Sequence, residues 1–250
     1  MFPGILVRTP NMRVSHEILD PGVESFFVTT SDGKKIEVWH LASAAPGPAR
    51  TAILFHDHAE NLAQFFVVQR WVAKLGYSTY AFDYRGFGRS SGWPSEKGLY
   101  LDAEAVWDVA MKRDSAVPER VLIMGHSIGT GPAAYLAAAH QVKTLVLLSP
   151  YLSIPALVRG IPYLRYFEPL LWYRFPVRDY VSRLKKTCLV IAHGERDTTI
   201  PISHSRELAT TQQDRLAVHT VFAAQSGHNE LIAVAKWGVV AAIKKCEEAP

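Results

Sequence analysis

The segment MGHSIGTG, residues 124–131, decides the fold of this chain. Within it, Gly125-His126-Ser127-Ile128-Gly129 fits the pattern G-x-S-x-G at the junction of an apolar run and a helix-period run. Small residues are needed on both sides of the serine because a tight strand-to-helix turn brings them against neighbouring backbone. Such a turn lifts the Ser127 hydroxyl clear of a sheet, at the positive end of a helix. The stretch predicts a nucleophilic serine, and a glycine-rich turn with an incidental serine is the competing interpretation.

Apolar, β-branched runs alternate with helix-period segments on both sides of this turn. The runs predict eight strands, at residues 24–30, 35–42, 51–57, 77–84, 120–125, 143–149, 187–193 and 217–224. Helices are predicted at 61–75, 99–113, 127–140, 204–213 and 229–246. This alternation favours a mostly parallel sheet with helices on both faces, and the first two strands form an antiparallel hairpin. We expect a single α/β domain over residues 1–250, with a small cap inserted at about 154–186.

The bulk composition excludes several classes of protein. With 250 residues, 48% of them apolar and 20% charged, the chain matches an ordinary globular domain and not a disordered or repetitive one. No apolar run reaches the about 18 residues needed to span a bilayer. Cys188 and Cys246 are too few for a disulfide framework. They are expected to be free thiols in a reducing, cytoplasmic compartment.

Positive charge and aromatic rings concentrate in the cap. The net charge of the chain is +4, but residues 154–186 alone carry +5, because seven basic residues stand against Glu168 and Asp179. The same segment holds seven aromatic residues: Tyr163, Tyr166, Phe167, Trp172, Tyr173, Phe175 and Tyr180. Basic and aromatic residues together suit an acyl group presented from an anionic membrane surface. The simpler interpretation is that the rings pack the cap onto the sheet and the charges are solvated.

Two kinds of ligand are not expected. The excess of positive charge is confined to the cap and no recognition motif is present, so nucleic acid is not an expected partner. No G-x-G-x-x-G follows the first strands, so no dinucleotide cofactor is expected, and no other cofactor is indicated.

A serine hydroxyl needs a base, and the base needs an orienting carboxylate. Asp197 follows the predicted seventh strand, and His228 follows the eighth within a small-residue approach, so both lie at carboxyl ends of strands. The order Ser127, Asp197, His228 is the one expected for a nucleophile elbow in an α/β sheet. Glu195 is the rival acid, but it stands nearer the strand end. The rival histidines fall inside strands or at helix ends: His40, His140, His204 and His219.

The segment HDHAEN, residues 56–61, offers a metal cluster or an oxyanion loop. Three adjacent ligands point in different directions, and no second spaced cluster such as H-E-x-x-H exists, so no metal is expected. Acyl transfer needs N–H donors aimed at the oxyanion, one from the residue after the nucleophile and one from the loop after the third strand. The backbone N–H groups of Ile128 and His58 are the candidates.

Three sequence blocks together resemble the α/β-hydrolase superfamily. They are HDHAEN, DYRGFGRSSG at 83–92 and GHSIG, and the chain from about residue 24 onward is similar to the α/β-hydrolase domain-containing 13 and 17 proteins and their bacterial relatives. The resemblance implies the α/β-hydrolase fold, with Ser127 as nucleophile, Asp197 as acid and His228 as base. It implies a bracing role for Asp83 and Arg85. Asp57 departs from the family's usual glycine, and we expect its carboxylate to point away from Ser127.

These observations predict a serine hydrolase that cleaves carboxylic esters or thioesters through an acyl-enzyme, without a cofactor. Acyl-protein thioesterase (depalmitoylase), hinted at by the resemblance, and aminopeptidase-like hydrolase are the alternatives within enzymes. The aminopeptidase alternative lacks an obvious acidic pair to hold a substrate amine. From another class, the chain could be a non-catalytic binding or membrane-docking module on a hydrolase scaffold, an alternative that Asp57 keeps open.

Overall fold

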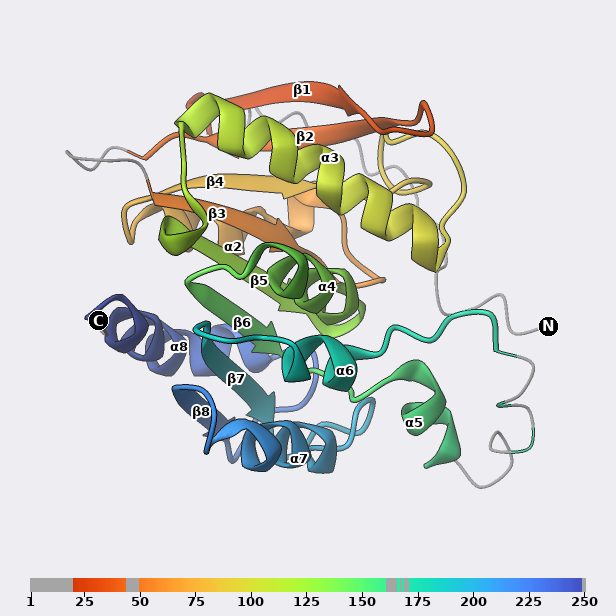
Figure 1. Ribbon diagram of the computed structural model, residues 1–250, viewed down its shortest axis with the longest axis vertical. Helices are drawn as coiled ribbons and strands as arrows, with labels where there is room; N and C mark the ends of the chain where they lie inside the picture. Colours follow the sequence, from red (N-terminus) through yellow and green to blue (C-terminus); the bar gives the residue numbers. More distant parts are fainter. Residues whose placement is uncertain (1–19, 44–49, 161–165, 167, 169–170, 249–250) are drawn as a thin grey trace. The chain divides into compact units, whose positions relative to one another are not determined.

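The computed structural model describes residues 20–43, 50–160, 166, 168 and 171–248. Eight strands form one sheet in the order β1-β2-β4-β3-β5-β6-β7-β8 (Figure 1). The sheet has the mostly parallel arrangement of the α/β-hydrolase fold, as predicted. By internal contacts the chain divides within β5 (Val121–His126) into two compact units, residues 3–123 and 124–250. The prediction of a single domain over 1–250 stays a prediction.

The unit formed by residues 3–123 begins with the predicted hairpin. Strand β1 (Val23–Thr29) pairs antiparallel with β2 (Lys35–Leu41), and β2 pairs antiparallel with β4 (Tyr77–Phe82). Strand β3 (Arg50–Phe55) then pairs parallel with β4. All six residues of β4 are buried, including the polar Ser78 and Thr79, so this strand shows no alternation of buried and exposed residues.

Two helices of this unit begin at polar caps. Asn61 accepts a hydrogen bond from Gln64 N–H and begins α2 (Leu62–Ala73). Ser95 accepts from Gly98 N–H and begins α3 (Glu96–Asp114), three residues before the predicted start at 99. The cap was hidden in a segment rich in glycine and proline, because composition there indicates a loop while the Ser95 side chain satisfies the first turn.

The unit formed by residues 124–250 carries the parallel strands that follow the elbow. Strands β6 (Thr144–Leu148), β7 (Cys188–Gly194) and β8 (Val218–Ala223) pair in parallel. Helices α4 (Thr130–His140) and α7 (Ser203–Gln212) cover one face, and α8 (Leu231–Glu248) covers the other (Figure 1). The cap contributes two short helices, α5 (Ile154–Arg159) and α6 (Val177–Ser182). In the described part of the chain, no helix combines the length and the apolar character needed to cross a bilayer.

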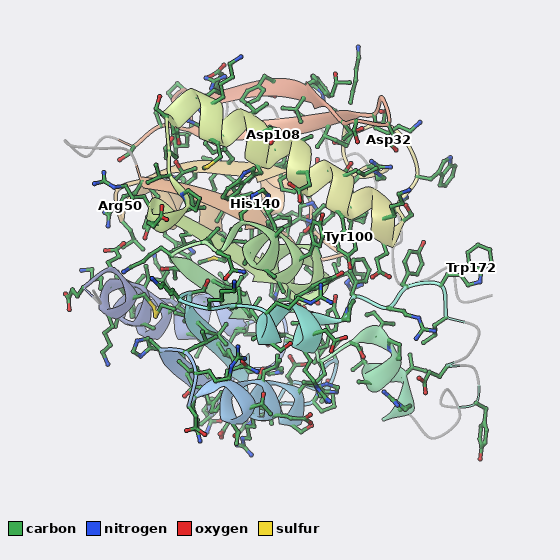
Figure 2. All side chains as sticks on the ribbon, viewed as in Figure 1. Asp32, Arg50, Tyr100, Asp108, His140 and Trp172 are labelled. Atoms are coloured by element: carbon green, nitrogen blue, oxygen red, sulfur yellow. A yellow bond between two sulfur atoms is a disulfide. The ribbon has the colours of Figure 1, made fainter. Side chains whose placement is uncertain are left out.

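The Asp83 and Arg85 side chains brace the loops of the first unit. Asp83 Oδ1 accepts from Leu62 N–H at 3.0 Å, at the start of α2. The Arg85 guanidinium donates to Asp102 of α3 at 3.0 Å and to Asp32 at 2.8 Å. Asp32 lies in the turn between β1 and β2 (Figure 2). Asp102 is fully buried, so its charge depends on Arg85 for compensation.

We expect Asp102→Ala to destabilise the protein by about 3 kcal/mol, because it leaves the buried Arg85 charge without its buried partner. Urea denaturation followed by tryptophan fluorescence measures the loss. Asp108→Ala is the matched control, since Asp108 is an exposed aspartate on the same helix and should change stability by less than about 0.5 kcal/mol. Equal effects of the two substitutions would contradict the bracing role.

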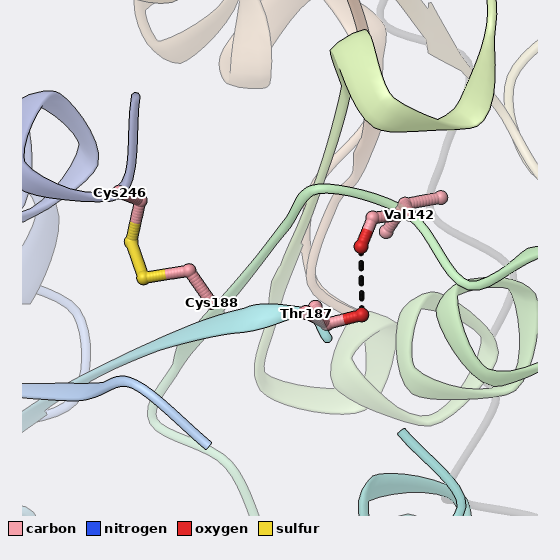
Figure 3. Close-up of a disulfide and its surroundings, with 4 residues drawn as sticks. All are labelled: Val142, Thr187, Cys188 and Cys246. Carbon is pink, nitrogen blue, oxygen red and sulfur yellow. Dashed lines mark hydrogen bonds between the residues drawn. A yellow bond between two sulfur atoms is a disulfide. The ribbon is translucent and has the colours of Figure 1, made fainter. Parts of the chain in front are cut away.

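The prediction of two free thiols is wrong, because Cys188 and Cys246 form a disulfide (Figure 3). Cys188 begins β7 and Cys246 lies in the last turns of α8, with the two Cα atoms 5.6 Å apart. Both residues are buried. Packing of α8 against β7 brings together two residues that are 58 positions apart in the sequence. The argument for a reducing compartment, which rested on free thiols, is lost with this correction.

Removing this bridge should cost stability. Closing a loop of 58 residues removes chain entropy from the unfolded state worth about 4 kcal/mol. We therefore expect the double substitution Cys188→Ser and Cys246→Ser to lower the free energy of unfolding by about that amount. Chemical denaturation with and without a reducing agent measures it. Reductant should destabilise the wild-type protein and leave the double variant unchanged, and a loss below about 1 kcal/mol would contradict the prediction.

Candidate active site

Ser127 occupies a strained turn at the end of β5. Its φ of 53° lies in the left-handed region, which a non-glycine residue rarely adopts. A single turn of 3-10 helix, Ser127–Gly129, leads directly into α4. Gly125 makes this turn possible, because a Cβ there would lie 2.5 Å from Gly129 O and 2.8 Å from Ala133 Cβ. The first glycine of the motif therefore has a steric cause.

The loops after β7 and β8 pack closely against each other and place Asp197 next to His228. Gly194 ends β7, and a Cβ on it would lie 2.3 Å from Ser226 O. The absence of a side chain lets the two loops approach, and Arg196 N–H donates to Ser226 O at 3.0 Å. Asp197 and His228 stand on these two loops. Sequence reasoning recognised the small residues before His228 but missed Gly194.

The three predicted residues form a continuous hydrogen-bonded chain. With its proton on Nδ1, His228 donates to Asp197 Oδ2 at 2.6 Å, and Ser127 Oγ donates to His228 Nε2 at 3.0 Å. All three side chains are buried. The His228 ring stacks on the ring of His126, with centroids 5.6 Å apart. This geometry can move a proton from the serine hydroxyl to an imidazole whose tautomer is held by a carboxylate.

Asp197 has further partners that favour its ionised form. Its Oδ1 accepts from the backbone N–H groups of Thr199 at 2.9 Å and Ile200 at 2.8 Å. Burial opposes ionisation, but hydrogen bonds from His193, His228 and Ile200 outweigh it and hold the pKa of Asp197 well below its ordinary value. Asp197 is therefore a charged acceptor at neutral pH. Sequence reasoning missed His193, because a histidine inside an apolar strand gives no periodic signal.

The rival residues lie elsewhere. Glu195 is exposed and pairs with Arg206 at 3.2 Å. His204 Nδ1 accepts from Leu152 N–H at 3.2 Å, and His40 bonds to Ser78 at 2.9 Å. None of these contacts involves the Ser127–His228–Asp197 chain.

The HDHAEN loop belongs to the unit of residues 3–123. Asp57 Oδ1 accepts from the backbone N–H of His58 at 2.5 Å and lies 2.8 Å from His58 Nδ1. The side-chain hydrogen bond between His58 Nδ1 and Asp57 raises the pKa of His58. His56 Nδ1 donates to Asp57 O at 2.7 Å, and its Nε2 lies 3.3 Å from Asp83 Oδ1. The backbone N–H of His58, which we expected to face an oxyanion, thus donates to Asp57. That it acts together with the Ile128 N–H as an oxyanion hole stays a prediction.

The cap residues divide into a packed and an exposed set. Phe175 is fully buried, Tyr173 stacks on it, and Tyr180 meets Tyr135 edge to face at 5.6 Å. Trp172 and Tyr166 are instead 92% and 71% exposed. The predicted cap residues Tyr163, Arg165 and Phe167 lie outside the described residues.

The chain is similar in sequence to a known protein family and to several known proteins. The family model for serine aminopeptidase, S33, matches residues 46–238. Alpha/beta hydrolase domain-containing protein 17C of Mus musculus is 32% identical over 212 residues, or 84% of this chain and 63% of the relative. Protein 17B of Homo sapiens is 31% identical over 84% of this chain and 70% of the relative. The chain thus spans less than two thirds of the length of the first of these relatives.

Solved structures share the architecture at lower identity. The esterase Pf2001 of Pyrococcus furiosus superposes with a TM-score of 0.77 at 20% identity, over 97% of this chain and 98% of the esterase. An alpha-beta hydrolase of Vibrio vulnificus gives a TM-score of 0.77 at 19% identity, over 94% of this chain and 88% of the other. At such identities the likeness is one of fold.

Proposed function

Because the chain belongs to the α/β-hydrolase superfamily, and within it to the serine aminopeptidase S33 family, we propose that it is a serine hydrolase of carboxylic esters or thioesters. The observation that carries the proposal is the hydrogen-bonded chain from Ser127 through His228 to Asp197. Ser127 is the nucleophile, His228 the general base and acid, and Asp197 the residue that orients His228.

The proposed reaction proceeds through an acyl-enzyme. Ser127 Oγ attacks the carbonyl carbon while its proton passes to His228 Nε2, and a tetrahedral oxyanion forms. His228 then donates that proton to the leaving alcohol or thiol as the bond to it breaks, which leaves the acyl group on Ser127. A water molecule repeats the sequence, giving its proton to His228 and releasing the acid and the free serine. Asp197 stays ionised and stabilises the imidazolium in both halves.

We also propose that backbone N–H groups of Ile128 and His58 hold the oxyanion. Ile128 follows the nucleophile in the turn that starts α4, where N–H groups point out of the helix end. The His58 N–H must first leave the carboxylate of Asp57. Asp57 is therefore the residue whose position decides whether this donor is available.

Labelling with a fluorophosphonate probe tests the proposal, because the probe reacts with an activated serine. Wild-type protein should be labelled, and Ser127→Ala should not. Ser149→Ala is a matched control. Like Ser127, Ser149 is buried, follows a buried strand and has a φ in the left-handed region, at 47°. An inert wild-type protein would support the alternative of a non-catalytic module on a hydrolase scaffold.

The substrate class is open to a direct comparison. An acyl-protein thioesterase would favour long-chain acyl thioesters, whereas an aminopeptidase would release amines from aminoacyl anilides. The name of the matching family favours testing the second, although the triad alone supplies no group for a substrate amine. We expect turnover of p-nitrophenyl esters and acyl thioesters to exceed that of anilides. The reverse order would move the proposal to the peptidase.

We further propose that the cap contacts an anionic membrane surface. A hollow of about 480 Å³ is lined by Arg159, Arg174 and Arg178 together with acidic residues. Trp172 extends outward from the same segment (Figure 2). Arg159 pairs with Glu168, and Arg178 pairs with Glu207. The arrangement suits a lipid phosphate beside an inserted aromatic ring.

Trp172→Ala should weaken binding to anionic vesicles about tenfold, since burial of a large aromatic side chain in the interface contributes about 1.5–3 kcal/mol. Sedimentation with phosphatidylserine-containing vesicles measures the change. Trp237→Ala is the control, because Trp237 is another tryptophan with a largely exposed side chain and lies on α8, outside the cap. Binding that is absent, or that is lost equally in both variants, would contradict a role for the cap.

A further inference from the structure

A cluster of metal-ligating side chains lies on the unit of residues 124–250 and shares no residue with the triad. Cys188 of β7, His219 of β8 and Cys246 of α8 each offer one ligand atom, and these atoms all lie within 4.8 Å of one another. Three separate elements contribute, so the cluster is a product of tertiary packing. His219 pairs with Val190 in the β7–β8 register, and Val190 lies two residues after Cys188 in β7.

The surroundings of the cluster suit a bound ion. Both cysteines are buried, while His219 is half-buried and lines a hollow of about 460 Å³ between β8 and α8. Two thiolates and one imidazole form a three-ligand set of the kind that binds Zn²⁺, with a fourth position left for water or an added group. Because His219 lines the hollow, the imidazole ligand can be reached from solvent on that side.

We propose that Cys188, His219 and Cys246 form a Zn²⁺ site when the disulfide is reduced. A dithiol reductant supplies two electrons and two protons, which opens the S–S bond and leaves two thiols while the dithiol becomes a disulfide. The metal then displaces the two thiol protons and binds both thiolates and the imidazole. The covalent bond between α8 and β7 is thereby replaced by coordinate bonds at the same place.

Metal uptake by the two redox forms tests the site. After reduction and removal of the reductant under anaerobic conditions, we expect about one Zn²⁺ per chain and a higher melting temperature when Zn²⁺ is added. Co²⁺ should give thiolate charge-transfer absorption and the visible bands of tetrahedral coordination. The oxidised protein should show none of these changes. Uptake that is equal in both forms would overturn the proposal.

Two variants assign the ligands. His219→Ala should weaken Zn²⁺ binding at least tenfold, while His140→Ala, a half-buried histidine at the end of α4, should not change it. The paired change of Cys188→Ser and Cys246→Ser should abolish binding. Affinity unaffected by His219→Ala overturns the assignment. So does a reduced chain that loses its near-ultraviolet circular dichroism and does not regain it with Zn²⁺.

A second, independent observation concerns His193, which is fully buried in β7. Its Nε2 lies 2.8 Å from Ile200 O and 3.2 Å from Asp197 Oδ2, and its Nδ1 lies 2.6 Å from Ser205 Oγ. Because Ile200 O can only accept, Nε2 carries a proton. Ser205 can then donate to Nδ1, which holds the ring in this tautomer.

We infer that His193 is a positioning residue for Asp197, an inference that rests on the proposed function. Its N–H fixes the loop through Ile200 and supports the carboxylate oxygen that also accepts from His228. Without this donor, His228 is the one remaining side-chain donor to Asp197 Oδ2 among the described residues. The carboxylate then stabilises the protonated form of His228 more strongly. The acid limb of the kcat/KM profile should then move to higher pH.

The pH profile of His193→Phe tests this role. We expect kcat to fall about tenfold with little change in KM, together with the upward shift of the acid limb. His193→Gln, which keeps a donor, should restore both. An unshifted profile in a folded His193→Phe protein overturns the inference alone. Full activity of Ser127→Ala would instead overturn the proposed function.

Discussion

Ser127→Ala should lower kcat for a p-nitrophenyl acyl ester by about 10⁴- to 10⁶-fold, which leaves only the contribution of binding and oxyanion stabilisation. The reason is structural, since Ser127 Oγ is the atom that lies 3.0 Å from His228 Nε2. The variant should remain folded, because Oγ is replaced by hydrogen and the turn keeps its β-carbon. The initial rate of ester hydrolysis, measured with a high concentration of the variant, gives the residual activity.

The control for this experiment is Ser149→Ala. Ser149 shares with Ser127 a buried position and a left-handed backbone, so any general cost of replacing such a serine appears in both variants. We expect its kcat to stay within about threefold of wild type. If Ser127→Ala kept most of the activity, a different nucleophile would be required.

The second large effect is expected from Asp197→Asn, with a fall in kcat of about 10⁴-fold. The amide keeps its oxygen toward the N–H groups of Thr199 and Ile200, because these donors need an acceptor and an NH₂ group cannot serve as one. Its NH₂ then faces His228 Nδ1 and donates, so the histidine proton moves to Nε2. Nε2 can no longer receive the proton of Ser127, although the local backbone is kept.

Glu195→Gln serves as the matched control, because Glu195 is the other carboxylate near the end of β7. It is exposed and pairs with Arg206, so we expect kcat to change by less than about twofold. A larger loss in Glu195→Gln than in Asp197→Asn would reassign the acid. The two variants therefore decide between the two carboxylates that the sequence offers.

Local sequence patterns predict most of the fold. The glycine-flanked serine, the buried apolar runs and the turn at Ser31-Asp32-Gly33 depend on nearby residues, and their periodicity predicts the strands and the antiparallel hairpin. The order of Ser127, Asp197 and His228 could also be predicted, because parallel strands present their carboxyl ends at one edge. Here the structure joins the three by hydrogen bonds within one unit.

Contacts between distant residues could not be predicted. Cys188 and Cys246 meet only because α8 packs along β7, and a separation of 58 residues contains no information on distance. His193 looks like any residue of a buried strand until its partners Asp197 and Ser205 are placed. The hydrogen bond between Asp57 and the His58 N–H depends on a side-chain rotamer, which composition does not determine.

The disulfide also determines what a protease could do to this chain. Asp197 and His228 both lie between Cys188 and Cys246, and so do the exposed loops on either side of α7. A single cut in one of those loops would leave two fragments that still migrate together until a thiol is added. The acid and the base would remain on one covalently joined body after such a nick, so cleavage there need not separate them.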